Sequence, residues 1–112
     1  MADVNVAHPV TRASSGALHG KLDTGADVTV IPERLVAQPG MTPNRHIWVR
    51  GYDGTYSRRA VYYVRLAVEG FELPSVRCVA ADRANILLGR NVLNRFVIML
   101  DGQKLTFDLQ RP

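Results

Sequence analysis

The clearest indication of the fold is a single segment, Leu22-Asp23-Thr24-Gly25-Ala26-Asp27-Val28-Thr29-Val30-Ile31-Pro32. A carboxylate, Asp23, follows one apolar segment, and a second, β-branched segment begins at Val28, which predicts a short loop between two strands. Gly25 permits a close backbone approach, and the hydroxyl of Thr24 can hydrogen-bond to the loop backbone. An Asp-Thr-Gly tripeptide alone is more often a simple turn, so the stretch does not establish catalysis without further support.

The sequence around this stretch predicts mainly strands. Alternating apolar residues and β-branched runs indicate strands over residues 28–31, 45–50 and 56–68. Only two short segments can be helical, residues 33–37 and 90–95, so we predict an all-β protein with one short carboxy-terminal helix. Turns are expected at four glycine-containing pairs, the last three of which close hairpins: Pro39-Gly40, Asp53-Gly54, Glu69-Gly70 and Asp101-Gly102.

Length and composition favour one domain spanning residues 1–112. The chain is 46% hydrophobic, which is enough for a packed core, and its longest apolar run, residues 96–100, is far below the ~20 residues of a membrane span. We therefore expect a cytoplasmic protein with no membrane partner. A single cysteine, Cys78, excludes an internal disulfide and a zinc site built on paired cysteines, and we expect no metal and no cofactor.

The charge balance suits an anionic partner only if the basic residues cluster. Fourteen basic residues against ten acidic ones give a net charge of +4, but Arg58-Arg59 is the only adjacent basic pair. We therefore expect a solvated basic surface and no nucleic acid partner. A basic β-barrel that binds nucleic acid remains an alternative at this point.

A second motif changes the interpretation of the first. It is Asn85-Ile86-Leu87-Leu88-Gly89-Arg90-Asn91-Val92-Leu93. Together the two motifs resemble the catalytic loop and the apolar strand, glycine and arginine of the retropepsin-like aspartic proteases, both retroviral and single-domain bacterial. The resemblance covers about residues 16–96. It implies a closed β-barrel or sandwich, assembly as a two-fold homodimer, and hydrolysis of a peptide or protein substrate.

The resemblance also implies a mechanism. Asp23 is the expected catalytic aspartate, and because each chain has one such motif, two chains must each supply one carboxylate. The pair activates a water molecule without a metal or cofactor. Thr24 matches a position whose hydroxyl bonds to the other subunit's loop, and Gly25 matches one whose backbone contacts substrate. The alternative is a protease-fold dimer that binds peptides or proteins without cleaving them, against which the intact motif argues.

Further positions match the family less closely. Asp27 is expected to form a buried, charge-assisted pair with Arg90, and Gly89 to support it. The hairpin over residues 48–56 takes the place of the flap, the β-hairpin that closes over bound peptide. Val28 stands where retroviral members often have an acid, so a more apolar subsite is expected. The expected substrate-binding residues are Ala26, Asp27, Val28, Val30, Gly51, Tyr52, Asp53, Gly54 and Ile86.

Two segments depart from the retroviral pattern. The segment before Asp23 is irregular at Ser14-Ser15-Gly16, and only Arg12 can replace an arginine that pairs with Asp27 across the dimer. A hairpin over residues 97–109 is longer than the single closing strand of the retroviral enzymes, and we expect it to form the dimer sheet.

The remaining conspicuous side chains have simpler interpretations. Cys78 is expected to be a buried apolar filler, and His19 to lie on the solvent side of a strand. Trp48 and Tyr63 are expected to pack in the core or on the sheet, and Asn91 to be an ordinary residue of the first helical turn.

Overall fold

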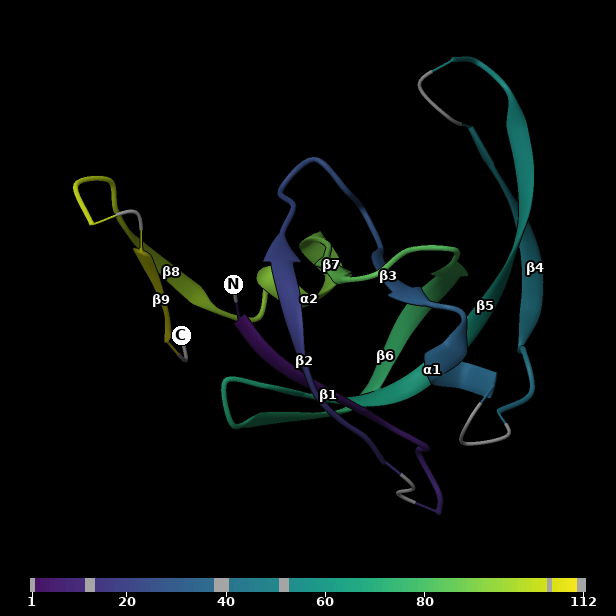
Figure 1. Ribbon diagram of the computed structural model, residues 1–112, viewed down its shortest axis with the longest axis horizontal. Coiled ribbons are helices and arrows are strands. Elements are labelled where there is room, and N and C mark those ends of the chain that lie inside the picture. The colour runs from purple at the N-terminus through teal and green to yellow at the C-terminus, as the bar shows by residue number, and fades with distance from the viewer. Residues whose placement is uncertain (1, 12–13, 38–40, 51–52, 105, 111–112) are drawn as a thin grey trace.

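The computed structural model describes residues 2–11, 14–37, 41–50, 53–104 and 106–110 (Figure 1). Strands dominate, and the two helices have four residues each. The elements are β1 (Ala2–Ala7), β2 (Ser14–Leu22), β3 (Thr29–Pro32), α1 (Arg34–Ala37), β4 (Arg45–Arg50), β5 (Tyr56–Val68), β6 (Phe71–Ala81), β7 (Ile86–Leu88), α2 (Arg90–Leu93), β8 (Val97–Asp101) and β9 (Thr106–Gln110).

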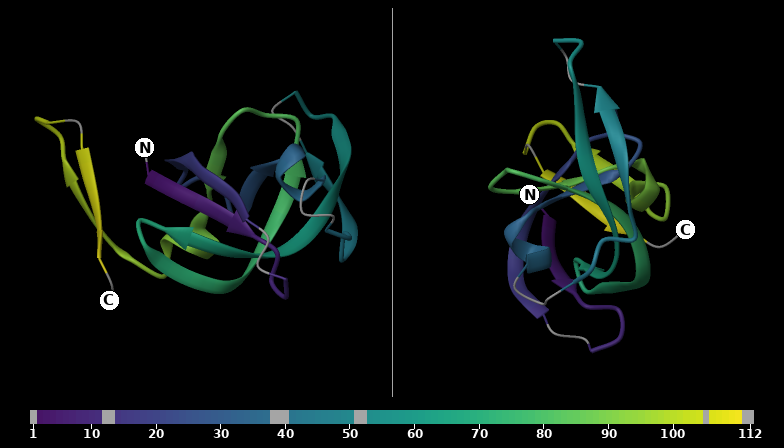
Figure 2. Two further views of the ribbon diagram at one scale, coloured as in Figure 1. Left: turned by 60° about the horizontal axis from the view of Figure 1, so that its bottom comes forward. Right: turned by 90° about the vertical axis from the view of Figure 1, so that its right-hand side faces the viewer.

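A closed barrel forms the body of the molecule. Its strands are hydrogen-bonded in the order β1-β2-β7-β3-β6-β5, and antiparallel pairing of β1 with β5 closes the ring. β4 pairs with β5, and the two strands rise from the barrel as a long hairpin (Figure 1). The strands β8 and β9 form a separate two-stranded sheet, which projects away from the barrel as an arm (Figure 2).

The barrel core consists of aliphatic side chains from alternate strand positions. In β5, for example, Val64, Leu66 and Val68 are fully buried. Burial of apolar surface stabilises the fold by roughly 25 cal/mol per Å². The bounds predicted for β4 and β5 are confirmed, as are the hairpins at 53–54, 69–70 and 101–102, whereas α2 is two residues shorter than expected. The turn predicted at Pro39-Gly40 lies outside the described residues.

The irregularity expected at Ser14-Ser15-Gly16 is a local one within a strand. The segment before Asp23 is the nine-residue strand β2, which pairs with β1. The Ser14-Ser15-Gly16 sequence reflects a shift of register opposite Asn5 and Ala7, where Gly16 adopts a φ of +83°. A β-bulge of this kind often needs glycine, because residues with a Cβ rarely adopt positive φ.

The predictions for isolated side chains had mixed outcomes. Cys78 is fully buried as expected, and burial raises the pKa of its thiol. His19 is exposed, also as expected. Trp48 and Tyr63, however, are not core residues, since 69% and 42% of their surfaces are exposed. Trp48 is exposed because the β4–β5 hairpin extends past the barrel and no other described element covers it.

Candidate active site

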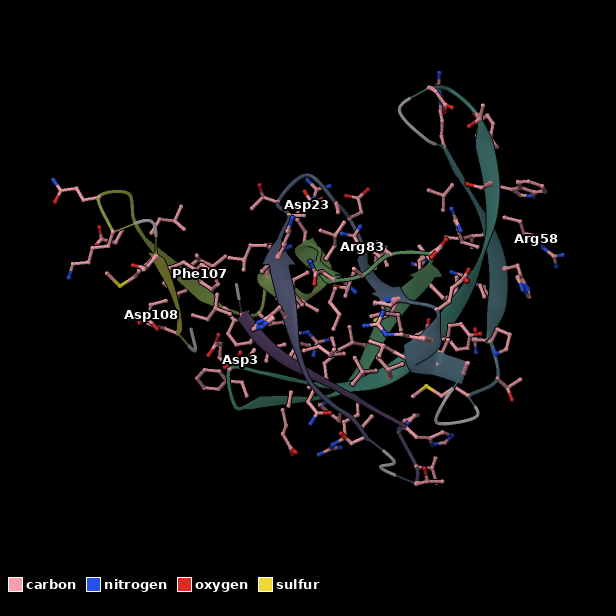
Figure 3. All side chains as sticks on the ribbon, in the orientation of Figure 1. Asp3, Asp23, Arg58, Arg83, Phe107 and Asp108 are labelled. Atoms are coloured by element: carbon pink, nitrogen blue, oxygen red, sulfur yellow. The ribbon has the colours of Figure 1, made fainter. Side chains whose placement is uncertain are left out.

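Asp23 lies where β2 ends, on a loop fastened to the neighbouring strand β7 (Figure 3). Its backbone N–H donates to the carbonyl of Leu88 at 3.0 Å, and its own carbonyl accepts from the N–H of Ala26 at 3.2 Å. The N–H of Gly25 donates to Asp23 Oδ1 at 3.0 Å. The half-buried carboxylate is therefore oriented by the backbone of its own loop, and Thr24 beside it is exposed.

The two sequence motifs meet at this loop. The N–H groups of Arg90 and Asn91 donate to the carbonyls of Ala26 and Asp27, at 2.8 and 3.3 Å. Gly89 lies so close to the loop that an added Cβ would stand 2.5 Å from the carbonyl carbon of Val28. The second motif thus holds the Asp23 loop by main-chain contacts that require glycine at this position for space.

We predict that Gly89→Ala destabilises the protein and weakens any activity of the site. Since φ at Gly89 is −84°, the cost is steric and not conformational, and overpacking of this kind costs about 1–3 kcal/mol. Urea unfolding would measure it. Gly102→Ala is the matched control, because no atom lies within 4 Å of the added Cβ, and an equal loss of stability in both variants would contradict the close-approach argument.

Asn91 and Thr29 form a hydrogen-bond network that was not predicted from the sequence. Asn91 Oδ1 accepts hydrogen bonds from the backbone N–H and the hydroxyl of Thr29, both at 2.9 Å, and its amide donates to the carbonyl of Arg77 at 2.8 Å. The Thr29 hydroxyl in turn accepts from the N–H of Gly89 at 3.1 Å. Asn91 is therefore more than a helix residue, because its side chain ties β3 and β6 to α2. A polar threonine inside an apolar strand was the available signal.

Asp27 and Arg90 form the predicted ion pair, but its environment differs from the expectation. The side chains are 80% and 49% exposed, so the pair is not buried in this chain. An exposed pair contributes at most about 1 kcal/mol to stability. The ion pair therefore adds little stability, and its relevance to the site is its position on the loop that follows Asp23. Arg12, the expected partner across a dimer, lies outside the described residues.

An open groove of about 570 Å³ is lined by the loop that follows Asp23 and by residues of β3, β4 and β6. Apart from Asp27 and Arg50 its lining is apolar or glycine. The strand residues Ile47, Val49 and Val79 were not predicted as site residues. The lining consists of Gly25, Ala26, Asp27, Val28, Val30, Ile47, Val49, Arg50 and Val79.

The assignment of Ile86 to a subsite is wrong. Ile86 is fully buried in the barrel core, as is Leu88, whereas the partly exposed Leu87 pairs with Val30 of β3. Because side chains alternate between the faces of a strand, Leu87 shares a face with Val30, and its two neighbours point inward.

The described part of the hairpin tip is a compact polar turn. Asp53 Oδ1 accepts hydrogen bonds from the hydroxyl and the N–H of Thr55, at 2.7 and 3.1 Å, and Gly54 has a φ of +82°. The hydroxyl bond is the main reason that the pKa of Asp53 is lowered. Because the pKa is lowered in the folded state, the ionised carboxylate stabilises the turn at pH values above the ordinary carboxyl pKa. This contribution is lost only as the pH falls through the lowered pKa. Gly51 and Tyr52, also predicted at the tip, lie outside the described residues.

The described residues contain neither a candidate metal site nor a helix that could span a membrane. These residues contain no group of three or more histidine, cysteine or acidic side chains placed to hold a metal ion. None of the helices among them combines the length and apolarity needed to cross a bilayer.

A closed barrel with an Asp-Thr-Gly loop fastened by a Gly-Arg-Asn segment defines a retropepsin-like fold. Comparison with known families agrees: the family described as aspartyl protease matches residues 13–92, and the chain belongs to that family. The predicted resemblance is thereby confirmed. No significant match was found among curated protein sequences.

Solved structures of foamy virus proteins share the fold. The solution structure of the simian foamy virus protease has 19% sequence identity and a TM-score of 0.62, covering 83% of this chain and 90% of that one. A foamy viral protease-reverse transcriptase in complex with an RNA/DNA hybrid has 20% identity and a TM-score of 0.61, covering 82% of this chain and 11% of that one. The prototype foamy virus protease-reverse transcriptase has 19% identity and a TM-score of 0.62, over 98% of this chain and 12% of that one.

Proposed function

We propose that this protein is a homodimeric aspartic endopeptidase in which Asp23 of each subunit supplies half of the catalytic pair. The observation that carries the proposal is the oriented carboxylate of Asp23 on a fastened loop whose following residues, 25–28, line a mainly apolar groove. The chain has one Asp-Thr-Gly motif, and the acid in the described groove lining, Asp27, forms an ion pair with Arg90. A second copy is the simplest source of the second carboxylate.

Two adjacent carboxylates cannot both ionise readily, so the pair shares one proton. The ionised carboxylate takes a proton from a water molecule, whose oxygen attacks the peptide carbonyl carbon, while the protonated carboxyl donates to the carbonyl oxygen. The tetrahedral intermediate then breaks its C–N bond as the nitrogen receives a proton. In this scheme Gly25 orients Asp23 Oδ1, and the exposed Thr24 hydroxyl is free to bond to the partner's loop.

The carboxy-terminal arm supports assembly as a dimer. It is a two-stranded sheet whose apolar residues Val97, Met99 and Leu100 are 46%, 57% and 77% exposed. Strand edges and apolar patches of this kind are normally covered in soluble proteins. We propose that the arms of two subunits cover one another and bring the two Asp23 loops together.

The direct test is incubation with a diverse peptide mixture at mildly acidic pH, with mass spectrometry of the products. The apolar lining of the groove predicts cuts between bulky apolar or aromatic residues. A hydroxyl-bearing peptide that replaces the attacking water should inhibit, and a chelator should not. Tight binding of that inhibitor without any cleavage would instead favour the alternative, a dimer that binds peptides and does not cut them.

We predict a bell-shaped dependence of the cleavage rate on pH, with a maximum at roughly pH 4 to 6. The rate rises as the pair loses its first proton and falls as it loses the second, so both limbs belong to the pair. The Asp53 turn keeps its stabilising contribution in this range, because the pKa of Asp53 is lowered. Initial rates across pH would measure the profile, and a rate that keeps rising above neutrality would exclude the shared-proton mechanism.

A further inference from the structure

The β4–β5 hairpin has a second face, which the proposed protease mechanism does not use. Ile47 and Val49 of β4 line the groove, so the alternate residues of this strand belong to the opposite face. There Trp48 lies directly across from Arg58, and Arg50 directly across from Tyr56. The two rings and two guanidinium groups alternate around a four-residue square, which we call the outer hairpin face.

The side chains of this face are open to solvent. Trp48 is 69% and Tyr56 63% exposed, and both arginines are exposed, although Arg50 also lines the groove. Among the described residues, none of these four side chains makes a hydrogen bond, an ion pair or a ring contact. Arg58 points away from the barrel (Figure 3). Nothing in the described fold explains why rings and cations are placed together here.

Most of the net charge of the protein lies on this hairpin. Residues 45–61 contain four arginines and one acid, Asp53, which amounts to +3 of the total +4. These arginines lie within one segment of the chain, and the pairing of β4 with β5 places Arg50 and Arg58 on opposite strands of the same hairpin. A local positive field of this kind attracts anionic polymers.

We propose that the outer hairpin face binds single-stranded nucleic acid. The two guanidinium groups match backbone phosphates, and the two rings provide surfaces on which unpaired bases stack. Trp48 and Tyr56 are diagonal cross-strand neighbours, about 7–8 Å apart, so one short oligonucleotide can contact both. A duplex hides its base faces, and an acidic peptide would use the arginines but leave the rings unused. This binding is independent of peptidase activity.

The protein carries its own reporter for this site, because Trp48 is its only tryptophan. Titration with a thymidine oligodeoxynucleotide should quench the fluorescence of Trp48 as a base stacks on the indole ring. Binding should weaken with salt, with a slope of log K against log salt concentration of about −1.4 per chain for two neutralised phosphates. Absence of both quenching and binding at low salt would overturn the proposal.

Variants separate charge from stacking. Arg58→Glu should abolish quenching, whereas Arg95→Glu, an equal change of charge at an exposed residue outside the hairpin, should preserve it. Trp48→Ala should weaken binding of a labelled oligonucleotide by roughly 5- to 150-fold in fluorescence anisotropy. Trp48→Phe retains a ring and should recover part of that loss. Equal loss in Arg58→Glu and Arg95→Glu would reduce the effect to net charge and contradict the proposed site.

Polyglutamate of matched length tests the competing anion. Little binding and no quenching by polyglutamate would support recognition of bases. Binding as tight as that of the oligonucleotide would show a general surface for acidic polymers, and the nucleic acid proposal would then be wrong.

Discussion

Asp23→Asn is expected to lower the rate of peptide cleavage by about 10²- to 10⁴-fold, the usual contribution of a positioned general acid or base. Asparagine has nearly the same shape as aspartate, and its side-chain oxygen can still accept the hydrogen bond from Gly25. It cannot take a proton from water. The loop should therefore keep its geometry while the chemistry stops. Initial rates on the best peptide from the mixture would measure the effect.

Asp82→Asn provides the matched control, since Asp82 is an exposed acid that does not line the groove. It should retain full activity, and both variants should unfold at the same urea concentration as the unmodified protein. Cleavage by Asp23→Asn above a tenth of the normal rate, in a preparation free of other proteases, would contradict the role assigned to this carboxylate.

Leu100→Asp is the second change from which we expect a large effect. Leu100 is 77% exposed on the arm, so the substitution removes few contacts within one chain. If two arms cover one another, a charge would be buried at their interface, and loss of such an anchor costs about 2 kcal/mol or more, roughly a 30-fold weaker dimer. Specific activity should fall with it and recover partly at high protein concentration. Analytical ultracentrifugation would measure the dissociation constant.

Val10→Asp is the control for Leu100→Asp. Val10 is 81% exposed and lies in the turn after β1, far in sequence from the arm. It should leave both assembly and activity unchanged. A Leu100→Asp protein that dimerises as tightly as the unmodified chain would remove the arm from the interface, while leaving the role of Asp23 to be judged by its own experiment.

The local sequence pattern predicted several strands and loops of this protein. The Asp-Thr-Gly loop, the Gly89-Arg90 segment and the strands β4 and β5 could be identified because turns and alternating side chains leave a signal within a few neighbouring residues. Strand β1 was missed although Ala2, Val4 and Val6 alternate at its buried positions. Its pairing with both β2 and β5 closes the barrel, and contacts between distant segments are not encoded in a short window.

Local sequence chemistry thus predicted the all-β class and the Asp-Thr-Gly loop, because both depend on neighbouring residues: glycine for space, β-branched residues for strands, and a carboxylate where a strand ends. Tertiary structure alone decided which face each residue occupies. Register within the sheet buries Ile86, turns Leu87 toward Val30, and sets Trp48 directly across from Arg58. A shift of one residue in strand pairing reverses every such assignment, and pairing is set by packing across the whole barrel.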